Sequence, residues 1–273
     1  ALTCPTQTAV WGFIATLRLE IGQKTSCVCV DLSPGMLEEE GAVQTVIKCV
    51  LDYSDEIGLA IDTDGQVYVQ RLAESCVGID RDLDSVQEDI SVDSDKTVVI
   101  TGGLGGLGLV AALRLLEHGA RHLLLLSRSG KVAKESWSMW EQVRMFPGAV
   151  VEVMRCDVCE ISEVQALFAA VRNAGRSIGG VIHTAGVLRD RMVRGMTGDD
   201  FDVVCAPKVG GAWNLHYATL LDAVDHFVTY SSISGLLGGI GQASYGFANA
   251  WMDGLSELRR GCGFESRSVQ WGP

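Results

Sequence analysis

One stretch of the sequence restricts the fold more than any other: residues 101–108, of which five are glycine, lie between a β-branched run and an apolar run. Glycines at such a junction let the chain turn tightly and approach a pyrophosphate, which the N-terminus of the following helix favours electrostatically. A merely flexible glycine loop is the alternative, but the position between a strand and a helix favours a dinucleotide site. The residues expected to contact the cofactor here are Thr101, Gly103, Leu104, Gly105, Gly106 and Leu107.

From residue 97 onward, short β-branched runs alternate with longer amphipathic stretches. This alternation is typical of a parallel sheet with helices on both faces. We therefore predict an α/β protein with a Rossmann-like, doubly wound parallel sheet. The predicted strands are Thr97–Thr101, His122–Ser127, Val150–Arg155, Gly180–Thr184, His226–Ser231 and Arg267–Trp271.

The first 96 residues predict a second, smaller α/β unit. A helix over Val10–Ile21, a strand over Cys27–Leu32 and a helix over Leu37–Tyr53 precede two strands that meet at Asp64-Gly65, a strong hairpin signal. This unit has no glycine-rich phosphate loop, so we expect it to be part of a noncatalytic structural subdomain. The acidic, weakly periodic residues that follow read as a linker. The predicted division is 1–73 structural, 74–96 linker and 97–273 catalytic.

Charge and composition exclude several classes of function. A net charge of -12 argues against nucleic-acid binding, which needs a basic surface. No apolar run approaches the roughly 20 residues of a membrane span and no signal-peptide pattern is present, so we expect a cytoplasmic protein without membrane contact. Cys156 and Cys159 form a Cys-x-x-Cys pair, but no second pair or suitably spaced histidine completes a zinc site. Reduced thiols and no metal are expected.

Residues after the later strands refine the cofactor prediction. Ser127-Arg128 ends the second strand of the core, where an arginine accommodates a 2′-phosphate, so NADPH is favoured over NADH. An ordinary surface cation is the alternative for Arg128. Asp157, beside Val158, is placed to accept a hydrogen bond from the adenine amine or to cap the next helix. After the fourth strand, the small residues Ala185 and Gly186 are expected to contact the nicotinamide. His183, at the end of that strand, is expected to be packed in the protein interior rather than catalytic.

Ser232 and Tyr245, thirteen positions apart, follow the fifth strand and would flank one site. This arrangement resembles the short-chain dehydrogenase/reductase superfamily, whose members mostly carry lysine four residues after the tyrosine. Here that position is Asn249, and Lys208 lies upstream, as in the ketoreductase domains of polyketide synthases and animal-type fatty acid synthases. The resemblance implies that Tyr245 donates a proton, Ser232 binds the carbonyl oxygen, and Lys208 and Asn249 support Tyr245. Lys208 and Tyr245 would also contact the cofactor.

The resemblance covers nearly the whole chain, from Ala9-Val10-Trp11-Gly12 to Gln270-Trp271-Gly272-Pro273. It implies NADPH-dependent reduction of a β-ketoacyl thioester on an acyl carrier protein, with neighbouring synthase domains as partners. The family's earlier strands and its later substrate lid have no counterpart, so we expect a fragment of a larger chain. A catalytically silent scaffold and a free-standing NADP-dependent alcohol dehydrogenase remain the alternatives.

The segment after the fourth strand bears on the product and the partner. Family members that give one alcohol configuration usually carry Leu-Asp-Asp, and this chain has Leu188-Arg189-Asp190, while Leu237 stands where members of the opposite type often have tryptophan. We therefore expect Asp190 to favour the D-configured alcohol. Three nearby cations are candidates for docking an acidic carrier protein, a solvated loop being the alternative. They are Arg189, Arg191 and Arg194.

Overall fold

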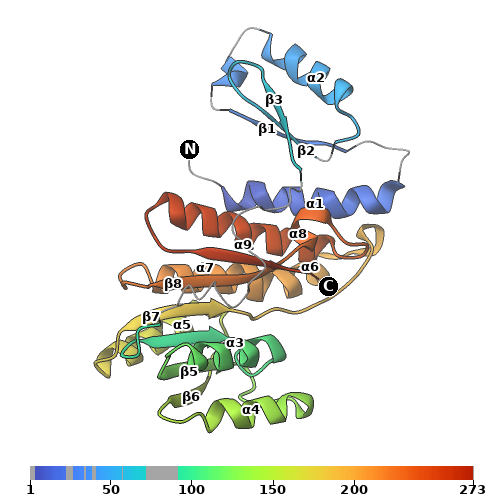
Figure 1. Cartoon of the computed structure of the whole chain (residues 1–273). Helices are drawn as coiled ribbons and strands as arrows, with labels where there is room; N and C mark the ends of the chain where they lie inside the picture. Colours follow the sequence, from blue (N-terminus) through green and yellow to red (C-terminus); the bar gives the residue numbers. More distant parts are fainter. Residues whose placement is uncertain are drawn as a thin grey trace, which may run out of the picture.

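Two sheets of unequal size form the molecule, with the larger one built entirely from residues 97–271 (Figure 1). The computed structural model describes residues 4–22, 27–33, 35–38, 41–56, 58–71 and 92–272. Residues 74–91 of the predicted linker lie outside the described residues. Among the helices of the described part, none has the length and apolar character that crossing a bilayer requires.

The larger sheet has six parallel strands in the order β6-β5-β4-β7-β8-β9. From the central strand β4, the chain adds β5 and then β6 on one side. It then crosses to the other side of β4 and adds β7, β8 and β9 there. The crevice beyond the carboxyl ends of β4 and β7 is therefore the point where the strand order reverses, which is where such sheets bind ligands. The predicted Rossmann-like class is confirmed. The strands are β4 (Thr97–Thr101), β5 (His122–Ser127), β6 (Val150–Arg155), β7 (Ile178–His183), β8 (His226–Ser232) and β9 (Arg267–Trp271).

Three strand predictions were wrong at their ends. In the smaller sheet, the strand predicted over Cys27–Leu32 begins at Cys29. The other two belong to the larger sheet. β7 begins at Ile178 rather than Gly180, and it ends at His183 because Thr184 turns toward β4. The backbone N–H and the hydroxyl of Thr184 both donate hydrogen bonds to the Thr101 carbonyl, at 3.2 and 2.7 Å. β8 continues to Ser232, one residue further than predicted, because Ser232 still pairs with Trp271 of β9.

Helices cover both faces of this sheet, as the alternating pattern of β4 requires. Val98 and Ile100 face the side of α3 (Gly106–Glu117), where they join Leu109 in one core cluster. Val99 faces the opposite side and clusters with Phe168 of α5. Burying each such side chain contributes about 1.5–3 kcal/mol. The other helices here are α4 (Trp137–Arg144), α5 (Ile161–Asn173), α6 (Gly198–Cys205), α7 (Gly211–Ala218), α8 (Ser234–Leu237) and α9 (Ala243–Gly261).

The smaller sheet has the order β1-β2-β3, with β1 and β2 parallel and the predicted hairpin between β2 and β3. Gly65 adopts a positive φ of 77° in the turn of that hairpin, as a tight turn requires. The predicted helix at Leu37–Tyr53 was wrong over its first residues, since a short 3-10 turn at Met36–Glu38 precedes Gly41, whose φ of 88° is not helical. The elements of this part are α1 (Pro5–Ile21), β1 (Cys29–Leu32), α2 (Ala42–Asp52), β2 (Gly58–Ile61) and β3 (Val67–Val69).

Helix α1 lies between the smaller sheet and α9 (Figure 1). It starts five residues before the predicted Val10 because Pro5 occupies the first turn, where a helix needs no N–H donor. The backbones of α1 and α9 approach closely where Gly12 meets Gly246: a Cβ on Gly12 would lie 2.3 Å from the Gly246 carbonyl oxygen. Helix α1 therefore packs directly behind the first turn of α9.

Candidate active site

A pocket of about 410 Å³ opens at the carboxyl ends of β4, β5, β6 and β7. Each of the four strands leads into a loop that contributes to its wall, as expected at the point where the strand order reverses. The predicted cofactor residues that line it are Leu104, Gly105, Ser127, Arg128, Asp157, Val158, Ala185 and Gly186. The remaining predicted cofactor residues, Thr101, Gly103, Gly106, Leu107, Lys208 and Tyr245, are not part of this lining.

Three glycines of the loop after β4 are required by packing within the protein. Gly102 has a φ of 63°, and a Cβ on Gly103 would lie 2.8 Å from the Ile100 carbonyl oxygen. A Cβ on Gly108 would lie 2.4 Å from the Gly102 carbonyl oxygen. At Gly106, by contrast, a Cβ would meet no described atom within 4 Å. The start of α3 thus leaves open space beside its free N–H groups, which suits a dinucleotide phosphate.

The loop after β5 contributes basic residues to this pocket. Arg128 is exposed at the rim, and Lys131, in the same loop after β5, also lines the pocket. Asp157 uses one carboxylate oxygen to accept a hydrogen bond from the Cys159 N–H at 3.0 Å, so it stabilises the turn before α5. The lining therefore fits a phosphorylated dinucleotide: glycines beside a helix N-terminus suit the pyrophosphate, and the two cations suit an additional phosphate.

Lys208 lies in a π-helical turn, Ala206–Gly210, that joins α6 to α7. Such turns are frequent at functional sites. The Lys208 side chain is 5% exposed. Its Nζ donates hydrogen bonds to Asn249 Oδ1 at 2.9 Å and to the Tyr230 carbonyl at 3.1 Å. Burial lowers the pKa of Lys208 to about 8, although the Asp253 carboxylate opposes this shift.

Tyr245 lies in the first turn of α9, and Lys208 Nζ is 5.1 Å from the centroid of its ring. Asn249, fully buried one turn later, donates from Nδ2 to the Tyr245 carbonyl at 2.8 Å while its Oδ1 accepts from Lys208. One amide side chain thus connects the lysine with the helix turn that carries the phenol. The structure brings together the Lys208 amine and the Tyr245 ring, as the sequence led us to expect.

Ser232 ends β8, and its Oγ accepts a hydrogen bond from the Ser234 N–H at 3.2 Å. A hydroxyl that accepts in this way keeps its own hydrogen for another partner. On the pocket side, Gly186 is close to Lys208: a Cβ at Gly186 would lie 2.9 Å from Lys208 Cε. The cofactor pocket and the Lys208–Asn249–Tyr245 cluster are therefore adjacent.

His183 is packed, as predicted. It is 1% exposed, and its Nδ1 shares a hydrogen bond with the Thr101 hydroxyl at 2.7 Å. Burial, with a contribution from the Lys208 charge, lowers the pKa of His183 to about 3, so the ring is neutral at physiological pH. The same Thr101 hydroxyl accepts from the Ala185 N–H at 3.3 Å. Thr101 and His183 thus fix the chain beneath the pocket.

Cys156 and Cys159 are both free thiols. Burial raises the pKa of the Cys156 thiol to about 11 and of the Cys159 thiol to about 12. Thiols with such pKa values are poor nucleophiles and poor metal ligands at neutral pH. No cluster of three or more potential metal ligands occurs among the residues that the structure describes.

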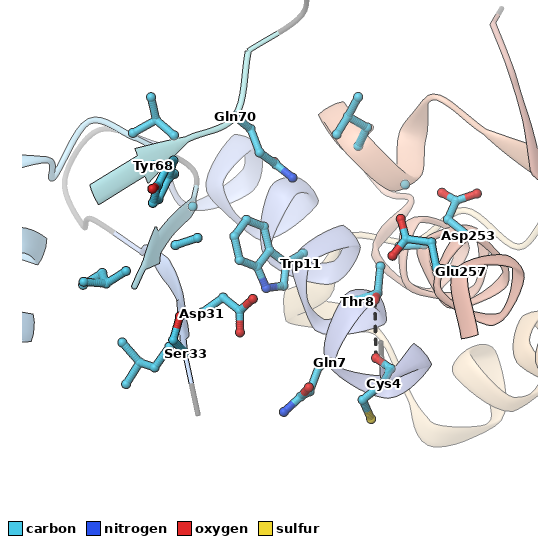
Figure 2. Close-up of a pocket in the computed structure, with 18 of the residues that line it drawn as sticks. Cys4, Gln7, Thr8, Trp11, Asp31, Ser33, Tyr68, Gln70, Asp253 and Glu257 are labelled. Carbon is cyan, nitrogen blue, oxygen red and sulfur yellow. Dashed lines mark hydrogen bonds between the residues drawn. The ribbon is translucent and has the colours of Figure 1, made fainter. Parts of the chain in front are cut away.

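A larger cavity, about 900 Å³, is lined by residues of α1, the smaller sheet and α9 (Figure 2). Its lining includes Trp11 of α1, Tyr68 of β3 and Asp253 of α9. Asp253 accepts a hydrogen bond from Gln270 Nε2 at 2.8 Å, and its pKa is raised mainly by burial. No residue of the glycine loop, 101–108, lines this cavity, so it is not the site that this loop forms.

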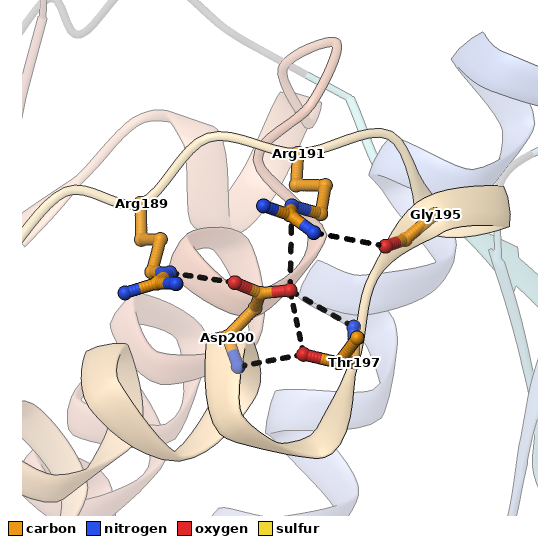
Figure 3. Close-up of polar contacts among 5 residues, drawn as sticks. All are labelled: Arg189, Arg191, Gly195, Thr197 and Asp200. Atoms are coloured by element: carbon orange, nitrogen blue, oxygen red, sulfur yellow. Dashed lines mark hydrogen bonds and ion pairs between the residues drawn. The ribbon is translucent and has the colours of Figure 1, made fainter.

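Two arginines of the basic segment after β7 share one carboxylate within the molecule (Figure 3). Arg189 Nε and Arg191 Nε both pair with Asp200, at 2.5 and 3.3 Å, and the Asp200 side chain is 1% exposed. Hydrogen bonds from Thr197, together with the two arginines, lower the pKa of Asp200 to about 2. Two of the three predicted docking cations thus hold the loop against α6. Asp190, between them, accepts a hydrogen bond from Gln242 Nε2 at 3.3 Å.

The sequence of residues 96–273 matches the family model described as the KR domain. The chain belongs to the KR domain family. This KR domain is 38% identical over 190 residues to the highly reducing polyketide synthase alnA of Emericella nidulans, a match that covers 70% of this chain and 8% of the synthase. The chain therefore spans less than a tenth of the length of that curated relative.

Solved ketoreductases share the fold of this KR domain. A structure described as an A1-type ketoreductase superposes with a TM-score of 0.86 at 30% identity, covering 98% of this chain and 54% of that one. The PlmKR1 ketoreductase from the first module of phoslactomycin biosynthesis in Streptomyces sp. HK803 gives a TM-score of 0.77 at 32% identity, covering 97% and 58%. The predicted resemblance to polyketide synthase ketoreductases is confirmed, and the family is one of oxidoreductases.

Several residues of this KR domain site escaped the sequence analysis. Lys131 was detectable, because it follows Arg128 by three positions in the same loop. Asp200 was also detectable, since Thr197 and Asp200 form a capping box at the start of α6. The hydrogen bond between Lys208 and the Tyr230 carbonyl was not detectable, because a backbone carbonyl can accept it whatever side chain the residue carries.

Proposed function

We propose that this KR domain uses NADPH to reduce a β-ketoacyl thioester, carried on an acyl carrier protein, to the 3-hydroxyacyl thioester. The observation that carries the proposal is the contact of the buried Lys208 amine with the Tyr245 ring, 5.1 Å from Nζ to the centroid, beside a pocket whose residues suit a phosphorylated dinucleotide. The polyketide synthases among its relatives support the acyl carrier protein and neighbouring synthase domains as partners.

In the proposed mechanism, Tyr245 donates its phenolic proton to the carbonyl oxygen of the substrate. The Lys208 ammonium favours the resulting phenolate, because an adjacent positive charge stabilises the ionised form. Ser232 donates a hydrogen bond to the same carbonyl oxygen. Asn249 holds Lys208 against the ring, so that the lysine or a bridging water returns the proton to Tyr245. Bound NADPH supplies the hydride.

Asp190 is proposed to favour the D-configured alcohol. Its hydrogen bond from Gln242, three residues before Tyr245, supports a role in aligning the acyl chain next to the phenol. The arginine cluster is a weaker basis for docking the carrier protein than its sequence suggested, since Arg189 and Arg191 share the Asp200 carboxylate, which offsets one of their two positive charges.

The proposal is tested by supplying NADPH with three ketones: a β-ketoacyl group on a carrier protein, the same group on a small thioester, and a simple ketone. We expect the lowest KM for the carrier-bound substrate, and chiral analysis of the product should give the D alcohol. Preference for the simple ketone would favour a free-standing alcohol dehydrogenase. Saturable NADPH binding without turnover of any ketone would favour a silent scaffold, and an L product would overturn the assignment of Asp190.

Arg128→Glu is expected to raise the Kd of NADPH by about tenfold to a hundredfold and to change that of NADH little, because it replaces a cation at the proposed 2′-phosphate position with a repelling charge. Fluorescence titration of both cofactors measures this. Arg114→Glu, at the opposite end of α3, makes the same charge change and should leave both affinities unaltered. Equal losses for NADH and NADPH would show that Arg128 does not select the phosphate.

The kcat/KM of the reduction should be level at low pH and fall about tenfold per pH unit above pH 8, because Lys208, with its pKa near 8, loses the proton that supports Tyr245 as pH rises. Initial rates between pH 6 and about 10 measure this. Lys208→Arg keeps a cation with a pKa above about 12, so its profile should lack that decline. A wild-type profile that stays level to pH 9.5 would contradict the role of Lys208.

A further inference from the structure

Two loops meet beside Tyr245. The first, residues 184–196, follows β7 and carries Asp190; the second, residues 238–242, connects α8 to α9 and leads into the turn that carries Tyr245. They touch through the Arg191 N–H, which donates to the Gly241 carbonyl at 2.7 Å, and through the Gln242–Asp190 contact. Their relative position therefore determines where Asp190 lies with respect to the phenol.

A third element, helix α1, holds both loops through one side chain. In the last turn of α1, Glu20 Oε2 accepts a hydrogen bond from the Val193 N–H at 2.6 Å, and Oε1 accepts from the Gly241 N–H at 3.0 Å. Each carboxylate oxygen thus serves one loop. Glu20 forms no ion pair with a cation of the described residues. The hydrogen bonds from the two backbone N–H groups are therefore the main interactions that stabilise its negative charge.

The turn before Glu20 adds a second attachment to the loop at 238–242. The fully buried Thr16 hydroxyl accepts from the Gly239 N–H at 3.2 Å. Gly238, with a φ of 74°, lies so close to α1 that a Cβ would be 2.6 Å from the Ala15 carbonyl carbon. Met192 and Ile240, two large apolar residues of these loops, are exposed and contribute little to holding them. The α1 contacts therefore add to the Asp200 ion pairs of the first loop and attach both loops to one helix.

We propose that Glu20 is a positioning residue of the reductase site: by holding the N–H groups of Val193 and Gly241 together, it fixes the Asp190 loop against the turn of Tyr245 and so aligns the acyl chain. This role rests on the proposed function. Glu20→Gln tests it with little change in shape, because the amide retains one acceptor oxygen but presents its NH₂ group to the other N–H donor. One of the two loops must then lose its hydrogen bond.

The experiment combines hydrogen exchange with kinetics on the folded protein. For Glu20→Gln, we expect amide exchange at Val193 or Gly241 to accelerate about tenfold or more, and the KM of the β-ketoacyl thioester to rise about tenfold with a small change in kcat. The Kd of NADPH should stay within about twofold of wild type, as the cofactor pocket is separate. Leu19→Gln, at an exposed position on the same helix, is the matched control and should change none of these.

Unchanged exchange and unchanged KM in Glu20→Gln would overturn the proposal. If that variant does not fold, Thr16→Val removes only the hydroxyl contact. We then expect faster exchange at Gly239 with Val193 still protected, and equal loss of protection at both would show that Glu20 has no separate role. A wild-type protein that reduces no ketone would refute the proposed function, while the exchange result would still decide whether Glu20 joins the loops.

Discussion

Tyr245→Phe is expected to lower the kcat of β-ketone reduction by about a thousandfold, because a positioned general acid contributes on the order of 10²–10⁴ in rate and phenylalanine has no proton to donate. NADPH binding should persist, since the residues that line the pocket are unchanged. Single-turnover rates with saturating NADPH measure the effect separately from product release.

Tyr217→Phe is the matched control for this change. Tyr217 is exposed on α7, so loss of its hydroxyl should leave the rate within about twofold of wild type. A Tyr245→Phe protein that kept more than about a tenth of the wild-type rate would mean that another group supplies the proton. Ser232 would then be the first residue to examine, since its hydroxyl hydrogen is free.

Gly12→Leu is expected to lower the free energy of unfolding by about 3 kcal/mol or more, corresponding to a Tm decrease of roughly 6–12 °C for a protein of this size. The new Cβ would lie 2.3 Å from the Gly246 carbonyl oxygen and 2.8 Å from Ala250 Cβ, so α1 and α9 must separate. Because backbone is involved, no rotation of a side chain relieves the clash.

Thermal and denaturant unfolding of the two glycine variants tests this. Gly198→Leu is the control: Gly198 is also helical, as the first residue of α6, but a Cβ there meets no described atom within 4 Å. Its Tm should fall by much less. If Gly12→Leu unfolded at the wild-type temperature, α1 would not be packed against α9 as described, and the attachment of Glu20 and Thr16 would be in doubt as well.

Most of the larger sheet was predictable because its signals are local. Four of its six strands, β4, β5, β6 and β9, have the predicted bounds. The buried strands β4 and β5 are continuous runs of apolar or β-branched residues, and turn residues follow them. The glycine loop was equally clear, because a tight turn and a close approach both demand residues without a side chain. These features depend on residues that are neighbours in the sequence.

Other parts depend on contacts that a single sequence does not reveal. From the sequence alone, Gly12 lowers the helix propensity of the segment that we predicted to be helical. In the structure, its missing side chain lets the backbone of α1 contact that of α9. Glu20 is 173 residues from Val193 in the sequence, and no local sequence pattern predicts their hydrogen bond. The π-helical turn around Lys208 had one indication, Pro207, which removes a helical hydrogen bond. The pairing of Lys208 with Tyr245 came from the family resemblance alone.

The division into residues 1–73, 74–96 and 97–273 stays a prediction. The position of α1 does not follow this division. By sequence α1 belongs to the first unit, but Glu20 of α1 hydrogen-bonds to the loops beside Tyr245 in the catalytic unit. We propose that α1 functions with the catalytic unit and that the smaller sheet forms the remainder of the structural subdomain.

Transfer of deuterium from NADPH labelled at carbon 4 of the nicotinamide to a β-ketoacyl thioester tests the central claim most directly. If the cofactor pocket and the Lys208–Tyr245 pair act on one ketone, mass spectrometry should find one deuterium at carbon 3 of the hydroxyacyl product, and Lys208→Met should lose nearly all of it while still binding NADPH. Bound NADPH that transfers no deuterium in the wild-type protein, or undiminished transfer in Lys208→Met, would contradict the account.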